Sequence, residues 1–250
     1  MPTFAGFDVS QAKTHISIVD DQGSELWHGS VATSPDALVL AVQEHAGGVL
    51  RIGMESGPLS PCLFHALKAK GLPIICIDAK AARAGLQLQG PNKTDRKDAN
   101  GIARIMQTGW YREVTVKEID GHKRQTALTV RKQLVGMRTE CINLIRGILK
   151  MYGKVLPSGK LPALKELILT DDLLAKAIGA VYSTLQTLGL EIKQIDKEIE
   201  LLAGEDEHCK VLQTIPGIGK ITSFAFAASI GDPKRFRKSR SVAGRNGPSV

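Results

Sequence analysis

Short hydrophobic runs separated by polar turns fill the chain from Thr3 to Asp78. Their lengths and spacing predict three strands, a helix, a strand, a helix and a strand, over residues 3–10, 14–20, 26–33, 35–46, 49–55, 59–71 and 72–78. Two more helices follow in the pattern, at about 79–88 and about 94–108. The first three strands are joined by short turns, and the later strands alternate with helices. That order is typical of an α/β ribonuclease-H-like fold, in which three antiparallel strands precede parallel ones.

The pattern then becomes helical and strongly basic. Between residues 91 and 160 there are 15 Lys and Arg against 6 Asp and Glu. A helix predicted over 124–151 carries an apolar stripe with a seven-residue period, formed by Leu128, Val135, Ile142 and Leu149. An adjoining stripe has the same period and holds Arg124, Arg131 and Arg138. Arginines beside an apolar seam either pair with acids of a neighbouring helix or bind phosphates, and the pattern leaves both alternatives open.

A second long helix is predicted over about 178–202. Its apolar residues alternate spacings of three and four for more than three heptads, at Ile178, Val181, Leu185, Leu188, Ile192, Ile195, Ile199 and Leu202. Such a seam requires a partner, either the basic helix of the same chain or the same helix of a second subunit. We expect a coiled-coil arm that helps to assemble a homo-oligomer.

The last part of the chain places a glycine turn between two apolar helical segments. Gly217 and Gly219 would let backbone N–H groups, with Lys220 beside them, approach a DNA phosphate as in a helix-hairpin-helix. A structural turn has the same sequence features. A basic cluster follows, at Lys234, Arg235, Arg237, Lys238 and Arg240. The whole pattern predicts three domains, over residues 1–115, 116–205 and 206–250.

Composition adds a preference for anionic partners. The 250 residues carry a formal net charge of +8 and a pI near 9.4, which favours DNA, RNA or anionic lipid, although a solvated basic surface has the same composition. No apolar run has transmembrane length and the N-terminus lacks the layout of a signal peptide, so we expect a cytoplasmic protein without a membrane partner. The cysteines form no C-x-x-C pair and are expected to be buried thiols, at Cys62, Cys76, Cys141 and Cys209.

Four carboxylates are expected at one edge of the predicted sheet. Asp8 ends the first strand and Glu55 ends the central parallel strand. Asp95 and Asp98 lie one turn apart at the start of a helix. Acids gathered at strand ends repel one another unless a divalent cation neutralises them, and hard oxygen ligands suit Mg²⁺ or Mn²⁺. Two such ions would clamp the attacking and leaving oxygens of a phosphodiester.

Each acid also has a plainer explanation. Asp8 could be a turn residue, and Asp95 and Asp98 a solvated first helical turn. Glu55 is the hardest to explain in this way, because a carboxylate directly after an apolar strand is costly without a partner. Basic side chains surround the acidic pair and would offer a path for a polyanion, at Lys93, Arg96 and Lys97.

Three stretches resemble the IS110 (Piv-type) family of bacterial insertion-sequence transposases: GFDVSQAKTHISIVD, GMESGPLSPCLFHALKAKGLPIICID and NKTDRKDANGIARIMQTGWYR. This resemblance implies an N-terminal DEDD domain related to the Holliday-junction resolvase RuvC. It places the four catalytic, metal-binding acids at Asp8, Glu55, Asp95 and Asp98. It also implies metal-dependent DNA strand cleavage and transfer in transposition, a serine nucleophile in the C-terminal domain, and a non-coding guide RNA that pairs with donor and target DNA.

Near its end the sequence departs from that family. Family members continue past the RFRKS block through a small-residue helix, a Gly-Leu-x-Pro turn and a Ser-Gly pair, whereas this chain reads RSVAGRNGPSV. Ser249 has no following glycine and is not assigned as the nucleophile.

One codon choice for residues 244–249, read one base later, encodes Ala-Ala-Met-Gly-Leu, so we expect a truncated or frameshifted copy. Whether it is an enzyme stays open, and a RuvC-like structure-specific endonuclease or a non-catalytic nucleic-acid-binding remnant are the alternatives.

Overall fold

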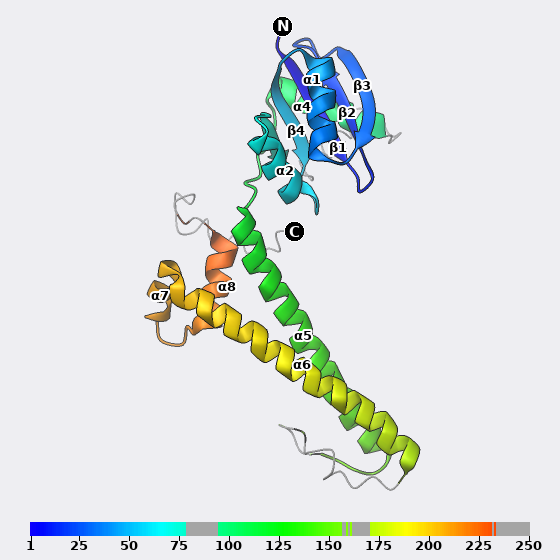
Figure 1. Cartoon of the computed structure of the whole chain (residues 1–250), viewed down its shortest axis with the longest axis vertical. Helices are drawn as coiled ribbons and strands as arrows, with labels where there is room; N and C mark the ends of the chain where they lie inside the picture. Colours follow the sequence, from blue (N-terminus) through cyan, green and yellow to red (C-terminus); the bar gives the residue numbers. More distant parts are fainter. Residues whose placement is uncertain (79–94, 157–158, 160, 162–170, 232, 234–250) are drawn as a thin grey trace. The chain divides into compact units, whose positions relative to one another are not determined.

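The chain divides into two compact units, Met1–Glu118 and Ile119–Gly247 (Figure 1). The computed structural model describes residues 1–78, 95–156, 159, 161, 171–231 and 233. The division lies near the domain boundary predicted at residue 115. The helix predicted over 79–88 lies outside the described residues.

A five-stranded mixed sheet forms the centre of the first unit. Its strands are β1 (Thr3–Val9), β2 (Lys13–Val19), β3 (Glu25–Ala32), β4 (Val49–Glu55) and β5 (Ile74–Ile77). Their order in space is β3-β2-β1-β4-β5. β2 pairs antiparallel with both β1 and β3, whereas β4 pairs parallel with both β1 and β5. The predicted order of antiparallel and then parallel strands is confirmed, and the mixed sheet agrees with the ribonuclease-H-like order expected from the sequence.

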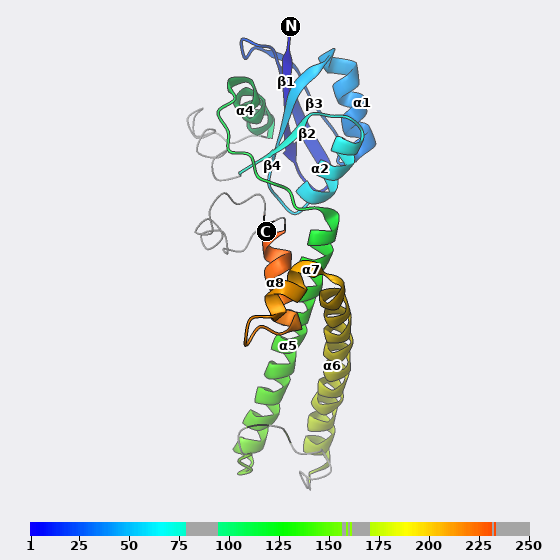
Figure 2. The same cartoon turned by 90° about the vertical axis from the view of Figure 1, so that its left-hand side faces the viewer.

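Helices cover both faces of this sheet (Figure 2). α1 (Pro35–Ala46) and α2 (Ser60–Ala69) lie on one face, and α4 (Asp95–Thr108) lies on the other. α1 begins where the sequence predicts, because the Ser34 hydroxyl accepts a hydrogen bond from the Ala37 N–H at 3.3 Å and Pro35 has a helical φ. Because successive residues of a strand point to opposite faces, β1, β2 and β5 contribute alternately to two cores.

The two cores have different sizes. The face under α1 and α2 buries the larger one, which includes Phe7, Ile16, Ile18, Leu38, Ile52, Met54 and Leu67. The face under α4 buries Phe4, Val19, Ile77, Ile102, Ala103 and Met106. Burial on both faces explains why β4 and β5 read as nearly continuous apolar runs.

Two glycines allow α4 to lie directly on the sheet. A Cβ atom built at Gly6 would lie 2.2 Å from the backbone oxygen of Ala99. Gly53 pairs with Gly6 across β1 and β4, and a Cβ there would lie 2.7 Å from the Met106 side chain. The backbone of α4 therefore contacts β1 without an intervening side chain.

The second unit contains α5 (Ile119–Met151), α6 (Asp172–Glu205), α7 (Glu207–Gln213) and α8 (Lys220–Ile230). α6 packs along α5, and α8 packs against both (Figure 2). One core cluster surrounds Ile145, Leu149 and Ile178, and another joins Ile199 and Phe224. The boundary predicted at residue 205 falls between α6 and α7, which share that second cluster. None of the described helices combines the length and apolar character of a membrane span.

The apolar seam predicted on α6 is largely covered by α5 of the same chain. Its buried members are Ile178, Leu188, Ile192 and Ile199. Leu202, the last predicted member, is 39% exposed, and Ala203 is buried in its place against α7 and α8. Of the two partners considered for the seam, the structure shows the one within the chain.

The cysteines are only partly as predicted. Cys76 and Cys209 are buried, whereas Cys62 is exposed and Cys141 is half-buried. The prediction was wrong for Cys62 because α2 turns Leu63 and Phe64 toward the core and leaves residue 62 on its outer side.

Candidate functional site

In two neighbouring strands, a glycine that faces α4 is followed two residues later by an acidic residue. Both acidic residues lie at the same edge of the sheet, where the parallel strands end. Gly6 of β1 and Gly53 of β4 both face α4 and are paired with each other. Asp8 and Glu55 follow two residues later, so they lie on the same face as these glycines. Because β1 and β4 are adjacent and parallel, the two carboxylate residues are neighbours, with backbones about 4.8 Å apart.

The side of α4 that faces the sheet also passes from apolar to acidic residues at this edge. Its buried stripe includes Ala99 and Ile102, and Asp95 and Asp98 precede these two residues by one turn each. The acids therefore continue, toward the helix N-terminus, the stripe that contacts the sheet. His15 stands opposite Asp8 in β2, and its Nε2 lies 3.4 Å from Asp95 Oδ2. The first turn of α4 thus lies at the edge that carries Asp8.

A cavity of about 490 Å³ lies between the loops that follow β1 and β4, and both Asp8 and Glu55 line it. The second loop is closed by its own hydrogen bonds. The Gly57 N–H donates to Ser60 Oγ at 2.6 Å, and the Ser60 hydroxyl donates to the Glu55 carbonyl oxygen at 2.9 Å. These bonds hold the backbone of Glu55 at the carboxyl ends of the parallel strands, where α/β sheets bind ligands.

The chemistry of these acids suits a hard divalent cation, since carboxylate oxygens are the ligands that Mg²⁺ and Mn²⁺ prefer. Asp8 and Glu55 share a cavity, and Asp95 lies at the same edge with a side chain that is 68% exposed. Within the described ranges, no group of three or more His, Cys, Asp or Glu side chains is close enough to hold a metal ion. The structure therefore brings two predicted ligands together without assembling all four.

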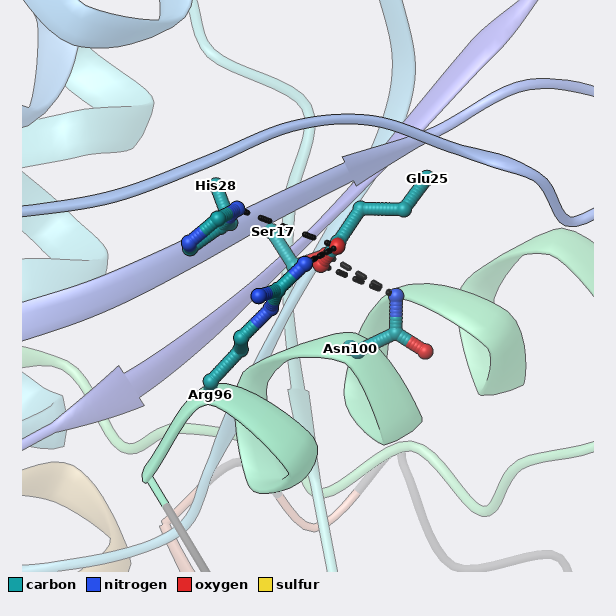
Figure 3. A network of polar contacts seen from close by, with 5 residues as sticks. All are labelled: Ser17, Glu25, His28, Arg96 and Asn100. Carbon is teal, nitrogen blue, oxygen red and sulfur yellow. Dashed lines mark hydrogen bonds and ion pairs between the residues drawn. The ribbon is translucent and has the colours of Figure 1, made fainter.

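A polar network that the sequence did not predict joins α4 to β2 and β3 (Figure 3). Arg96 Nη2 donates to Glu25 Oε2 at 2.5 Å. Ser17 Oγ donates to Glu25 Oε1 at 3.0 Å, and Asn100 Nδ2 donates to the same oxygen at 3.3 Å and to Ser17 Oγ at 3.1 Å. His28 Nδ1 lies 3.8 Å from Glu25 Oε2. The sequence signal is the polar Ser17 between Ile16 and Ile18, and a hydroxyl buried at that position requires a partner.

Glu25 is the charged centre of this network. Burial acts to raise its pKa, but the hydrogen bonds from Arg96 and Ser17 and the positive charge of Arg96 bring the pKa below its ordinary value. The carboxylate is therefore ionised at neutral pH, and both of its oxygens accept hydrogen bonds from α4.

The basic residues near the acids, which were predicted to bind nucleic acid, differ in their exposure and pairing. Arg96 is 58% exposed and is ion-paired with Glu25. Lys97 is exposed on the first turn of α4. Lys93 lies outside the described residues, as do Arg235, Arg237 and Lys238 of the C-terminal basic cluster.

The arginine stripe of α5 is used partly for internal ion pairs. Arg124 pairs with Asp206 and Arg131 pairs with Asp196. Arg124 also lies over the Phe224 ring, with its Cζ 5.3 Å from the centroid. The sequence left open whether these arginines pair with acids or bind phosphates. For these two residues, the structure shows pairing with acids of the same chain. Arg138 forms no ion pair with any residue that the structure describes.

The glycine turn lies between α7 and α8, as the sequence predicts. Gly217 has φ +87°, a conformation that favours glycine, whereas Gly219 lies in the β region, open to any residue, and forms the N-cap of α8. Both glycines are exposed. Lys220 begins α8 and its Nζ lies 3.6 Å from Glu200 Oε2 of α6.

Comparison with known proteins identifies the family. The family model DEDD_Tnp_IS110, described as a transposase, matches residues 5–153, which is more than half of the chain. The chain belongs to the IS110 transposase family. A second model, described as the transposase IS116/IS110/IS902 family, matches residues 209–247. The resemblance inferred from the sequence is therefore confirmed.

Curated members of this transposase family cover a similar part of the chain. The transposase for insertion sequence element IS1111A of Coxiella burnetii is 33% identical over 160 residues, which is 61% of this chain and 44% of that protein. The probable family 20 transposase of Pseudomonas aeruginosa is 28% identical over 161 residues, which is 61% of this chain and 48% of that protein. The chain thus spans less than half the length of each of these relatives.

Among solved structures, T. thermophilus RuvC in complex with Holliday junction substrate is similar to this IS110-family chain at 16% identity, with a TM-score of 0.34. The matched part covers 46% of this chain and all of that protein. A likeness this slight says nothing about function, and the observed strand order carries the fold assignment.

Proposed function

We propose that the first unit is the metal-dependent nuclease domain of a transposase that cleaves and transfers DNA strands during transposition of an insertion sequence. One observation carries the proposal. Along the contacting faces of three elements, apolar or small residues give way to carboxylates at the same edge of the sheet. This change occurs on β1 and β4, whose ends line the cavity, and on α4, whose first turn lies at the same edge through the contact of His15 with Asp95. The order of the acids along the chain, Asp-Glu-Asp-Asp, is also the order of letters in the family's name.

Asp8, Glu55, Asp95 and Asp98 are the residues that would hold Mg²⁺ or Mn²⁺. Bound there, the ion would neutralise the phosphate and favour attack on phosphorus. Asp8 and Glu55 offer ligands from rigid strand ends, whereas Asp95 and Asp98 offer them from the first turn of a helix. Lys97, next to the acids, would attract the DNA backbone, whereas Arg96 is held in its ion pair with Glu25.

The second unit is proposed to bind nucleic acid and to help assemble the active particle. Arg138 and the C-terminal basic cluster would contact phosphates, and the exposed turn around Gly217 and Gly219 would act as a helix-hairpin-helix. DNA, a non-coding guide RNA of the element and further copies of the chain are the proposed partners. The paired helices α5 and α6 would form the coiled-coil arm.

Thermal unfolding of the full chain with and without Mg²⁺ or Mn²⁺ tests the metal site. A ligand that binds only the native state stabilises it, by about 2.7 kcal/mol at a concentration of 100 Kd. We expect both ions to raise the Tm, and the double variant Asp95→Asn, Asp98→Asn to lose that response. Asp36→Asn is the matched control, because Asp36 lies on α1 on the opposite face and pairs with Lys70. If neither ion shifts the Tm of the unaltered chain, a non-catalytic nucleic-acid-binding role becomes the better explanation.

A further inference from the structure

The polar network of Figure 3 contacts α4 at two positions that are one helical turn apart. Arg96 and Asn100 both reach the carboxylate of Glu25. Residues spaced by four lie on one side of a helix, so two contacts of this kind fix both its height above the sheet and its rotation. Arg96 also lies between Asp95 and Asp98 in the chain, so its backbone position is coupled to those of both acids.

The strand side of the network is firmly held. Ser17 is fully buried, and its hydroxyl both donates to Glu25 and accepts from Asn100. The Glu25 side chain is 20% exposed. Ser17 lies in β2 and Glu25 begins β3, so the anchor is part of the antiparallel half of the sheet. Asp8 and Glu55, by contrast, end β1 and β4.

We propose that Ser17, Glu25, Arg96 and Asn100 are positioning residues that hold the first turn of α4, and with it Asp95 and Asp98, at the edge where Asp8 and Glu55 lie. This inference rests on the proposed metal site and assigns four residues to its support. These side chains would not touch the metal or the DNA in this role. They set the spacing between the ligands of the helix and the ligands of the strands.

Packing alone does not provide this control. The close contact of Gly6 with the Ala99 carbonyl fixes α4 next to Asp98 and four residues beyond Asp95. The N–H groups of a helix's first turn have no acceptor within the helix, so this turn is restrained less than the interior. The ion pair and the amide contact restrain this turn, and ionised Glu25 accepts from both groups at once.

Mn²⁺ binding to the full chain, followed by electron paramagnetic resonance, tests the role. Supporting residues around metal ligands typically change affinity by about 10-fold to 100-fold. We expect Asn100→Ala and Arg96→Met each to weaken Mn²⁺ binding by about 10-fold and to broaden the spectrum of the bound ion. Arg96→Lys keeps a cation that reaches Glu25 and should restore most of the affinity.

The sign of the Arg96→Met effect separates positioning from a simple electric field. Loss of a positive charge near a cation site strengthens cation binding by Coulomb's law, whereas loss of positioning weakens it. Asn100→Ala removes no charge, so a field effect predicts no change for it. Asp36→Asn serves again as the control, since it breaks an ion pair in the same unit away from α4.

Two different results would overturn the inference. If the unaltered chain binds Mn²⁺ and both Asn100→Ala and Arg96→Met bind it as tightly, the positioning role is wrong while the metal site stands. If the unaltered chain binds no Mn²⁺, the proposed site fails and the positioning role fails with it. Circular dichroism of each variant distinguishes a local effect from unfolding, and Asn100→Ala is the variant that least disturbs the fold.

Discussion

Gly6 is the residue that sets how closely α4 approaches the sheet. A Cβ at this position would collide with the backbone of Ala99 and Ala103, which cannot rotate away. At the paired Gly53, a Cβ would meet the flexible side chain of Met106 and the Ile102 methyl group. We therefore expect Gly53→Ala to lower the free energy of unfolding by about 1–3 kcal/mol, and Gly6→Ala to lower it by more. Urea denaturation measures both, and equal losses would contradict this account.

Because of Glu25, the stability of the first unit should fall at acid pH. Its folded pKa lies below its ordinary value, so its stabilising effect is fully present above the unfolded pKa of about 4.3 and is lost as pH falls through the lower folded pKa. Glu25→Gln should be less stable at neutral pH and should flatten the loss of stability below about pH 4.3. Urea midpoints measured across acid pH check this. A variant whose curve runs parallel to the unaltered chain at every pH would show that Glu25 contributes nothing through its charge.

At the scale of elements, one arginine of α5 joins the helices of the second unit. Arg124 pairs with Asp206, whose side chain also caps α7 by accepting from the Cys209 N–H at 3.0 Å. Burial acts to raise the pKa of Asp206, but the bonds from Arg124 and the α7 backbone lower it overall. The Arg124 side chain also lies over the ring of Phe224 in α8. A single cation therefore links α5, the start of α7 and α8.

This arrangement separates the arginines of α5 into two groups with different expected effects. Arg124→Ala should lower the free energy of unfolding by about 1.5–3 kcal/mol, because it leaves the mostly buried Asp206 unpaired. Arg138→Ala should stay within about 0.5 kcal/mol and should weaken nucleic-acid binding instead. Thermal unfolding and filter binding of both variants make the comparison. The division is wrong if Arg138→Ala destabilises the chain as much as Arg124→Ala.

At the scale of the whole molecule, the net charge of +8 governs association with nucleic acid. Binding through phosphates releases counterions, so the affinity for DNA or RNA should fall steeply and linearly in a plot of log K against log salt. Arg138→Ala should reduce the slope by about 1 if it contacts one phosphate. Fluorescence anisotropy at several salt concentrations measures both quantities. Affinity that does not change with salt, or no binding at low salt, would rule out binding that depends chiefly on phosphate contacts.

The periodicity of the sequence was sufficient for the elements and for much of the sheet. Each described strand and helix of the first unit lies within a few residues of its predicted bounds, because alternation and turn residues are local signals. The acids at Asp8 and Glu55 could be placed at strand ends for the same reason. That they also share the face under α4 depends on the register between β1 and β4, which the structure shows.

Tertiary structure alone decided which charged residues touch. Glu25, Ser17 and Asn100 are separated by as many as 83 residues along the chain, and no local pattern links them. The same holds for Arg124 and Asp206, because a basic stripe has the same sequence whether it meets acids of a neighbouring helix or phosphates of a ligand. Only the packing of α6, α7 and α8 against α5 brings an acid to Arg124 and Arg131 and leaves Arg138 without one among the described residues. Side-chain pairing over such separations depends on the relative placement of whole elements, which hydrophobic periodicity does not encode.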